Sequence, residues 1–162
     1  MLRNTKVSFF NNHIFQTTYG ILTFTDNTNI LIIYTFNQFP MKKILVVEDD
    51  PHIQTIYKQK LTQEGFEVIQ ATNGNQAMEF INQKPDLIII DIVLPGGMDG
   101  FDVIQKINES DIYKKIPVLV LTNLENKHKL AADMGVTNYL IKANTSINDV
   151  VKRIRELIYD QS

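Results

Sequence analysis

Five polar residues follow short apolar runs along the chain, and their side chains could together support phosphoryl transfer. They are Glu48, Asp49, Asp91, Thr122 and Lys142. Carboxylates that lie close together repel one another unless a cation or added protons compensate their charge. Mg²⁺ is the natural cation, because it prefers oxygen ligands and usually leaves positions open for phosphate oxygens. If the fold brings these side chains together, their types predict a magnesium-assisted phosphoryl transfer.

Three of these residues have distinct expected roles in such a transfer. Asp91 would act as the nucleophile, Lys142 would supply positive charge to the phosphoryl oxygens, and Thr122 would donate its hydroxyl hydrogen to them. Taken singly, each has an ordinary structural explanation as a loop-starting aspartate, a solvated lysine or a strand-end threonine. Their shared position after apolar runs favours the chemical interpretation.

Other chemistries lack their sequence signatures. The chain has no cysteine, and His13, His52 and His128 are not in a metal-binding spacing. It has neither a P-loop nor a Gly-x-Gly-x-x-Gly motif after the first apolar run. The segment Asp91-Ile92-Val93 lacks the second aspartate expected of a haloacid-dehalogenase-type phosphatase. A zinc site, a nucleotide-binding enzyme and such a phosphatase are therefore disfavoured.

From Met41 onward, short β-prone runs alternate with longer segments of helical spacing, in the order βαβαβαβαβα. The expected strands are Lys43–Val47, Glu67–Ala71, Leu87–Ile90, Val118–Leu121 and Tyr139–Ile141. The third and fourth are apolar throughout, as in a parallel sheet covered on both faces. Right-handed crossovers would place helices on both faces, and ligands then bind beyond the carboxyl ends of the strands. The expected fold class is an α/β doubly wound parallel sheet with the five polar residues at its ligand-binding edge.

The first and last helices have clear sequence signals. Asp50 is a helix cap, Pro51 occupies the first helical position, and Gly65 ends the helix. The expected apolar stripe of this helix is Ile53, Ile56, Tyr57 and Leu61. The last helix follows Thr145-Ser146. Its expected stripe is Ile147, Val150, Val151, Ile154, Leu157 and Ile158.

Composition indicates an ordinary globular protein in a reducing compartment. Of the 162 residues, 44% are hydrophobic and 21% are charged, and the net charge of −2 gives no reason to expect nucleic acid as a partner. The N-terminal apolar run 30–34 is far shorter than the ~20 residues of a membrane span. A secretory signal is disfavoured, because polar residues 11–13 follow Phe9-Phe10 and no Ala-x-Ala cleavage site appears. We therefore expect a cytoplasmic protein without a membrane partner.

Residues 1–40 differ in composition from the rest of the chain. They contain three charged side chains, whereas residues 41–162 contain 31. Two β-prone runs, 21–25 and 30–36, flank a polar segment at 26–29 and could form a hairpin, which is marginally stable on its own. We expect Met41 to be the natural start and residues 1–40 to be an extension outside the fold. A docking arm is the alternative.

The motifs of residues 41–162 resemble the receiver domain of two-component response regulators. The resemblance rests on Ile44–Pro51, Asp86–Asp91 with Leu94-Pro95 and Met98-Asp99-Gly100, Pro117–Thr122 and Gly135–Lys142. It implies a flavodoxin-like five-stranded sheet of order 2-1-3-4-5 with five helices on its two faces. It also implies that a histidine kinase or a phosphotransfer protein phosphorylates Asp91, and that Thr122 and Lys142 hold the phosphoryl group. The implied ligands of Mg²⁺ are Glu48 through water, Asp49, Asp91 and the backbone carbonyl of Val93.

The resemblance further implies a switch at Tyr139, whose ring turns inward as the Thr122 hydroxyl moves to the phosphoryl group. The surface of the last helices and strand would then change to bind a partner protein, and the last helices could also pair two copies as a dimer. Two departures from the family pattern stand out. Gly97 lengthens the loop after the acceptor, and Ala143 replaces the usual proline after Lys142, so the Lys142–Ala143 bond could be trans and Lys142 could point differently.

Three functional hypotheses follow from the sequence. The first is a stand-alone phospho-accepting receiver, because only three residues follow the last expected helix at about Tyr159 and the output must then be another protein. The second is a pseudo-receiver that binds partners without phosphorylation, which the complete acidic, threonine and lysine set disfavours. The third, a magnesium-dependent phosphatase acting on other molecules, has no recognisable substrate pocket. In the first case the protein is no enzyme beyond its own phosphorylation and dephosphorylation.

Overall fold

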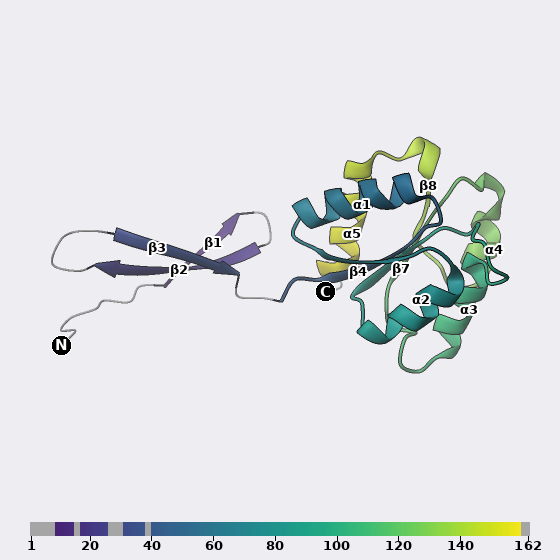
Figure 1. Ribbon diagram of the computed structural model, residues 1–162, viewed down its shortest axis with the longest axis horizontal. Helices are drawn as coiled ribbons and strands as arrows, with labels where there is room; N and C mark the ends of the chain where they lie inside the picture. Colours follow the sequence, from purple (N-terminus) through teal and green to yellow (C-terminus); the bar gives the residue numbers. More distant parts are fainter. Residues whose placement is uncertain (1–8, 15–16, 26–30, 38–39, 160–162) are drawn as a thin grey trace. The chain divides into compact units, whose positions relative to one another are not determined.

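The computed structural model describes the backbone of residues 9–14, 17–25, 31–37 and 40–159 (Figure 1). The chain divides into two compact units, Met1–Pro40 and Met41–Ser162. Each unit has its own sheet. None of the described helices is long and apolar enough to cross a bilayer.

The first unit contains an antiparallel sheet of order β1-β2-β3. Its strands are β1 (Phe9–Ile14), β2 (Thr17–Thr25) and β3 (Leu31–Asn37). β2 and β3 include most of the two β-prone runs seen in the sequence, and they pair from Tyr19 opposite Asn37 to Thr25 opposite Leu31. The segment expected to turn between them, 26–29, lies outside the described residues. β1 was not expected, because its centre is the polar Asn11-Asn12-His13.

The second unit is built on a five-stranded parallel sheet of order β5-β4-β6-β7-β8. Its strands are β4 (Lys43–Val47), β5 (Glu67–Ala71), β6 (Leu87–Ile90), β7 (Val118–Thr122) and β8 (Tyr139–Ile141). Its helices are α1 (Pro51–Gln63), α2 (Gly74–Phe80), α3 (Gly100–Glu109), α4 (His128–Asp133) and α5 (Ile147–Tyr159). Counted within this unit, the strand order is 2-1-3-4-5, which confirms the predicted flavodoxin-like fold.

Helices cover both faces of the parallel sheet, with α1 and α5 on one side and α2 and α3 on the other (Figure 1). Leu61 of α1 and Ile154 of α5 belong to one buried cluster, which includes Ile44 of β4. Ile104 of α3 belongs to the second cluster, which includes Leu45 of β4. Successive residues of a strand point to opposite faces. The central strands are therefore apolar throughout because both of their faces are buried.

Helix α1 begins as predicted but buries a different residue. The Asp50 side chain accepts hydrogen bonds from the backbone N–H groups of the first turn, and Pro51 is the first helical residue. Ile56, expected on the buried stripe, is 54% exposed, whereas Gln54 is only 8% exposed. Gln54 can be buried because its Nε2 donates to the backbone oxygens of Glu48 at 2.6 Å and Ala71 at 2.8 Å. The helix therefore ties together the residues that end β4 and β5.

Helix α5 confirms its predicted stripe except at Ile147, which is half-buried and lies outside the core cluster. Val150, Val151 and Ile154 are buried in the core, and Leu157 and Ile158 pack against the same cluster. Ser146 caps the helix, because its Oγ accepts from the backbone N–H of Asp149 at 3.2 Å and donates to the carboxylate of Asp149 at 2.6 Å.

The loop between β6 and α3 packs tightly at its end. A Cβ atom placed on Gly100 would lie 2.2 Å from the backbone oxygen of Asp91, so any side chain there would displace that backbone. Gly96 and Gly97 instead have positive φ angles of 92° and 81°, which favour glycine. The inserted Gly97 thus lies in an exposed turn, and the contact at Gly100 fixes where the helix begins relative to Asp91.

Candidate functional site

The parallel sheet brings the five predicted residues to one edge. Val47 of β4 lies opposite Ile90 of β6, so the residues that follow them, Glu48 and Asp91, start from neighbouring strand ends. Thr122 is the last residue of β7, and Lys142 follows the last residue of β8. The carboxyl end of the sheet therefore combines acidic, hydroxyl and basic side chains from four strands.

Glu48, Asp49 and Asp91 form an acidic cluster. One carboxylate oxygen from each lies within 4.8 Å of the other two. Glu48 is 3% exposed and Asp91 is 8% exposed, while Asp49 faces solvent. Two nearly buried carboxylates beside an exposed one leave an open side toward solvent. This oxygen-only donor set fits a hard divalent cation such as Mg²⁺, which keeps several waters or phosphate oxygens among its ligands.

Lys142 lies between the two buried carboxylates. Its Nζ is 2.6 Å from Oε2 of Glu48 and 2.5 Å from Oδ2 of Asp91. No cis peptide bond occurs among the described residues, so the Lys142–Ala143 bond is trans. The side chain thus reaches the acidic cluster although Ala143 stands where the family has proline.

Burial and charge act in opposite directions on these side chains. Burial raises the pKa of Glu48, and the neighbouring Lys142 ammonium only partly counters this effect. Burial also acts to lower the pKa of Lys142, but its hydrogen bonds to Asp91 and Glu48, together with the negative charge of both carboxylates, outweigh burial and raise that pKa. The ammonium is therefore held in its charged form as the compensating cation of the cluster.

Thr122 contributes a hydroxyl group without a partner. The residue is fully buried, and its Oγ1 forms no hydrogen bond with the described residues. A buried polar atom left unpaired typically costs about 1–3 kcal/mol. Such an atom at the end of β7 is a hydrogen-bond donor available to a group that arrives at the site.

Comparison with known proteins identifies the family. The model of the response regulator receiver domain matches residues 44–155. The chain belongs to the response regulator receiver family. This match runs from the second residue of β4 to Arg155 in α5 and includes all five residues of the site.

Relatives of this receiver domain include larger regulators. The DNA-binding dual master transcriptional regulator RpaA of a Synechocystis species is 35% identical over 73% of this chain and 49% of its own length. The alkaline phosphatase synthesis transcriptional regulatory protein PhoP of Bacillus subtilis is 33% identical over 70% of this chain and 48% of its own length. The chain thus spans about half the length of these curated relatives.

Solved structures of receiver domains resemble the second unit. The BeF3-activated N-terminal receiver domain of Klebsiella pneumoniae RstA matches with a TM-score of 0.66 and 31% identity, over 73% of this chain and 99% of that one. The chemotaxis response regulator CheY4 of Vibrio cholerae matches with a TM-score of 0.67 and 26% identity, over 73% and 99% of the two chains. These likenesses agree with the observed strand order.

Tyr139, the predicted switch residue, links β8 of the receiver domain to the segment after β7. Its hydroxyl donates a hydrogen bond to the backbone oxygen of Leu124. Its ring packs on His128, with ring centroids 3.9 Å apart and a tilt of 45°. Burial raises the pKa of its hydroxyl, which keeps that group a donor. The described arrangement therefore joins Tyr139 to the start of α4.

Sequence reasoning missed two side chains that form hydrogen bonds with the backbone beside the site. Gln54 holds the ends of β4 and β5, as described above. Asn123 accepts a hydrogen bond at Oδ1 from the backbone N–H of Ala143 at 3.2 Å. The sequence signals for both were weak. Gln54 is next to Ile53 of the expected helical stripe, and Asn123 directly follows Thr122.

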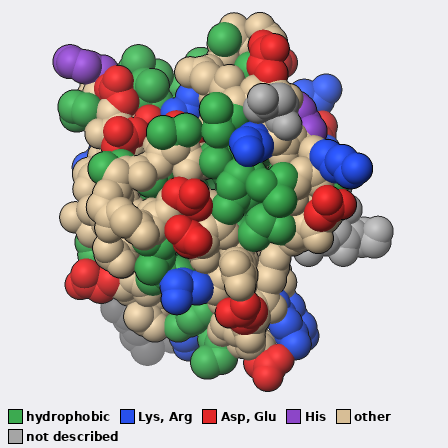
Figure 2. Space-filling view, turned by 90° about the vertical axis from the view of Figure 1, so that its right-hand side faces the viewer, with side chains coloured by type: hydrophobic (Ala, Val, Ile, Leu, Met, Phe, Trp, Pro, Cys, Tyr) green, Lys and Arg blue, Asp and Glu red, His purple; other side chains and the backbone are tan. Residues whose placement is uncertain are grey.

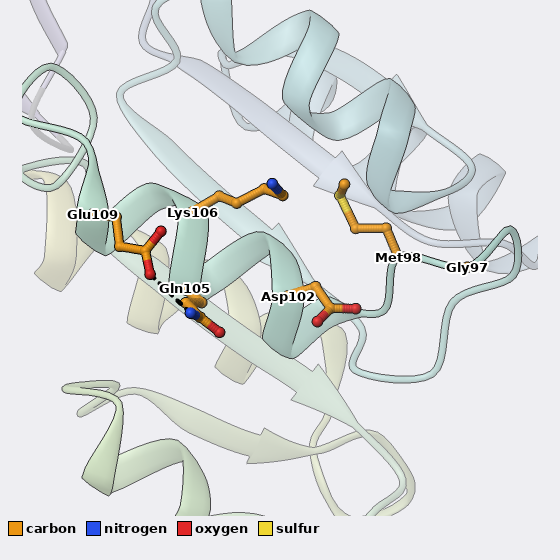
Figure 3. A pocket seen from close by; sticks show the side chains of 6 residues that line it. All are labelled: Gly97, Met98, Asp102, Gln105, Lys106 and Glu109. Atoms are coloured by element: carbon orange, nitrogen blue, oxygen red, sulfur yellow. Dashed lines mark hydrogen bonds between the residues drawn. The ribbon is translucent and has the colours of Figure 1, made fainter.

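Two hollows lie on the surface of the receiver domain. One of about 260 Å³ is lined by the loops after β6 and β7, at Ile92, Val93, Leu94, Asp99, Phe101, Leu124 and Lys127. On the face shown in Figure 2, hydrophobic side chains lie beside acidic and basic ones. The other hollow, of about 330 Å³, lies along α3 between Met98 and Glu109 (Figure 3). Neither contains the acidic cluster, which lies at the open edge of the sheet.

Proposed function

We propose that this receiver domain accepts a phosphoryl group on Asp91, with Mg²⁺, from a histidine kinase or a phosphotransfer protein. The observation that carries the proposal is the meeting of Asp91 with the Lys142 ammonium at 2.5 Å and with two further carboxylates. The buried hydroxyl of Thr122, which has no hydrogen-bond partner in the described part of the chain, ends the neighbouring strand β7. Charged and hydroxyl groups of this kind are those that phosphoryl transfer requires.

The acidic cluster would hold the metal ion. Asp49, Asp91 and the backbone carbonyl of Val93 would be direct ligands, and Glu48 would act through water. When bound, Mg²⁺ would neutralise the charge of the carboxylates and polarise the incoming phosphoryl group. The oxygen-only character of the cluster and its open side favour this assignment over a zinc site.

The chain's own residues would carry out the transfer. One oxygen of Asp91 attacks phosphorus, the bond from phosphorus to the donor's histidine nitrogen breaks, and that nitrogen keeps the electron pair and takes up a proton. Lys142 would turn its ammonium toward the phosphoryl oxygens, which carry more negative charge than the carboxylates alone. Thr122 would donate its hydroxyl hydrogen to one of those oxygens and so gain the partner it lacks.

Phosphorylation would change the surface around α4, β8 and α5. A phosphoryl group adds nearly two negative charges and three strong acceptors, and its contacts bias a two-state equilibrium. The link from Thr122 through Leu124 to Tyr139 gives a physical route from the site to β8. The output would be a change in affinity for a partner protein, which also accommodates a dimer through the last helices.

Intact mass spectrometry tests the acceptor. Incubation with Mg²⁺ and acetyl phosphate should add one phosphoryl mass that is lost at high pH. The adduct should be absent in Asp91→Asn and present in the matched variant Asp133→Asn, which changes an exposed aspartate of α4. A folded wild-type chain without an adduct would instead support the phosphorylation-independent interaction module.

We also infer that residues 41–162 fold and react without residues 1–40. All of the residues assigned to the site belong to the second unit, which has two buried clusters of its own. A chain that begins at Met41 should show the same thermal unfolding and the same phosphorylation rate as the longer chain. Loss of either property on truncation would favour the docking arm.

A further inference from the structure

Asn123 connects two loops at the carboxyl end of the sheet. It directly follows Thr122, and its Oδ1 accepts a hydrogen bond at 3.2 Å from the backbone N–H of Ala143. Ala143 directly follows Lys142. This contact therefore joins the residue beside the buried hydroxyl to the residue beside the ammonium that pairs with Glu48 and Asp91.

The loop that carries Lys142 has little else to hold it. Lys142, Ala143 and Asn144 form a single short 3₁₀ turn, closed by a long hydrogen bond of 3.4 Å from the N–H of Thr145 to the carbonyl of Lys142. Ala143 and Asn144 are exposed. The packing of this turn is thus weak, yet the Lys142 ammonium meets two carboxylate oxygens at 2.5 and 2.6 Å.

The identity of residue 143 makes the contact available. A proline has no backbone N–H and could not donate to Asn123. An alanine in a trans peptide leaves an N–H group at the protein surface, and Asn123 supplies the acceptor for it. The asparagine and the alanine therefore form one structural unit, although they are 20 residues apart in the sequence.

We propose that Asn123 is a positioning residue that holds the Lys142–Ala143 backbone, so that the Lys142 ammonium stays between Glu48 and Asp91. Its effect on phosphorylation rests on the proposed function, but its effect on the loop does not. A net contribution of about 1 kcal/mol for such a hydrogen bond corresponds to about a fivefold change in the equilibrium constant between the held and the released loop.

Amide hydrogen exchange and the side-chain nitrogen signal of Lys142 test the loop in the unphosphorylated, metal-free protein. In Asn123→Ala, the Ala143 amide should exchange about fivefold faster than in wild type, and the Lys142 ammonium signal should shift toward that of a solvated lysine. Asn123→Asp keeps a side-chain oxygen as acceptor and should retain slow exchange. Asn144→Ala removes another exposed asparagine from the same loop and should leave both signals unchanged.

The phosphorylation rate with acetyl phosphate tests the consequence. Asn123→Ala should slow the reaction, by at most about fivefold, whereas Asn144→Ala should not. In a chain that already carries Ala143→Pro, the donor is absent, so adding Asn123→Ala should cause no further loss. Equal losses in both backgrounds would show that Asn123 acts on the reaction by another route and would overturn the proposal.

The two readouts separate the ways in which the idea can fail. Unchanged Ala143 exchange in Asn123→Ala would show that the hydrogen bond does not hold the loop. Faster exchange with an unchanged Lys142 signal would show that the loop does not position the ammonium, and it would also overturn the proposal. If the wild-type chain accepts no phosphoryl group, the proposed function fails, while exchange and the Lys142 signal still decide whether Asn123 positions the lysine.

Discussion

The interior of the parallel sheet buries apolar side chains, whereas its carboxyl end buries polar and charged ones. In the interior, residues such as Ile44, Ile88 and Leu119 are fully buried among other apolar side chains. At the carboxyl end, two nearly buried carboxylates share one ammonium, and a buried hydroxyl has no partner among the described residues. The difference shows that the apolar interior stabilises the fold, whereas the polar residues at the carboxyl end reduce its stability. Such a cost is expected where a protein must bind a ligand or a charged group.

The largest stability effect should come from the interior. Leu119→Ala should lower the free energy of unfolding by about 2–5 kcal/mol, because it removes buried methyl groups and leaves a cavity. Urea denaturation followed by circular dichroism measures the change. Leu130→Ala, at a position 43% exposed, is the matched control and should change stability much less. Equal losses in the two variants would contradict the assignment of the core.

At the carboxyl end, Lys142→Met should destabilise the fold by about 1–3 kcal/mol at neutral pH, because Glu48 and Asp91 lose their cation. Burial raises the pKa of Glu48 above its ordinary value of 4.5, so the folded state binds the proton more tightly than the unfolded state. The stability that Glu48 contributes therefore falls as the pH rises from its ordinary pKa through the higher pKa of the folded state. The deficit of the variant should shrink on acidification, as Glu48 takes up a proton.

Denaturation at several pH values measures this deficit. Lys152→Met removes an exposed lysine of α5 and serves as the control. A deficit that stayed constant between neutral and acidic pH would show that the lysine contributes packing rather than charge. Addition of Mg²⁺ should reduce the deficit, because carboxylates that have lost their ammonium should bind the cation more tightly than those of wild type, and tighter binding to the folded state gives more stabilisation.

A smaller effect of the opposite sign is expected at Thr122. Thr122→Val keeps the shape of the side chain but removes the unpaired hydroxyl, so the free energy of unfolding should rise by about 1 kcal/mol. Phosphorylation should become slower in the same variant. Thr62→Val, at an exposed position of α1, controls for the general effect of the substitution. A loss of stability would indicate that the hydroxyl has a partner in solution.

The smallest effect should come from a polar contact away from this edge. Glu64, at the end of α1, pairs with Lys60 and with Arg155 of α5, and these contacts lower its pKa. Glu64→Gln should cost less than about 1 kcal/mol at neutral pH, since the pairs are partly exposed. A carboxyl group whose pKa is lowered in the folded state stabilises the fold at pH values above its ordinary pKa. This stabilisation is lost as the pH falls through the lowered pKa. Variant and wild type should therefore converge in acid, as thermal unfolding would show.

Much of the fold could be predicted because strands that are buried on both faces appear in the sequence as continuous apolar runs. The apolar runs of β6 and β7 mark central strands, and the polar residues after them mark the carboxyl end of the sheet. Periodicity could not predict that Gln54 replaces Ile56 in the core, because the choice depends on backbone acceptors at the ends of β4 and β5. Nor could it predict the contact of Asn123 with Ala143, which depends on the shapes of two loops.

The exposed position of Val93 offers a practical means of observing the site. Its side chain is 58% exposed and is separated from Asp91 by one residue. The chain contains no cysteine, so Val93→Cys would create a single thiol for covalent attachment of a fluorophore. The backbone of residue 93 would keep its N–H contact with Asp91. A dye at that point would report the arrival of metal and phosphoryl groups in real time, without a partner protein and without a radioactive donor.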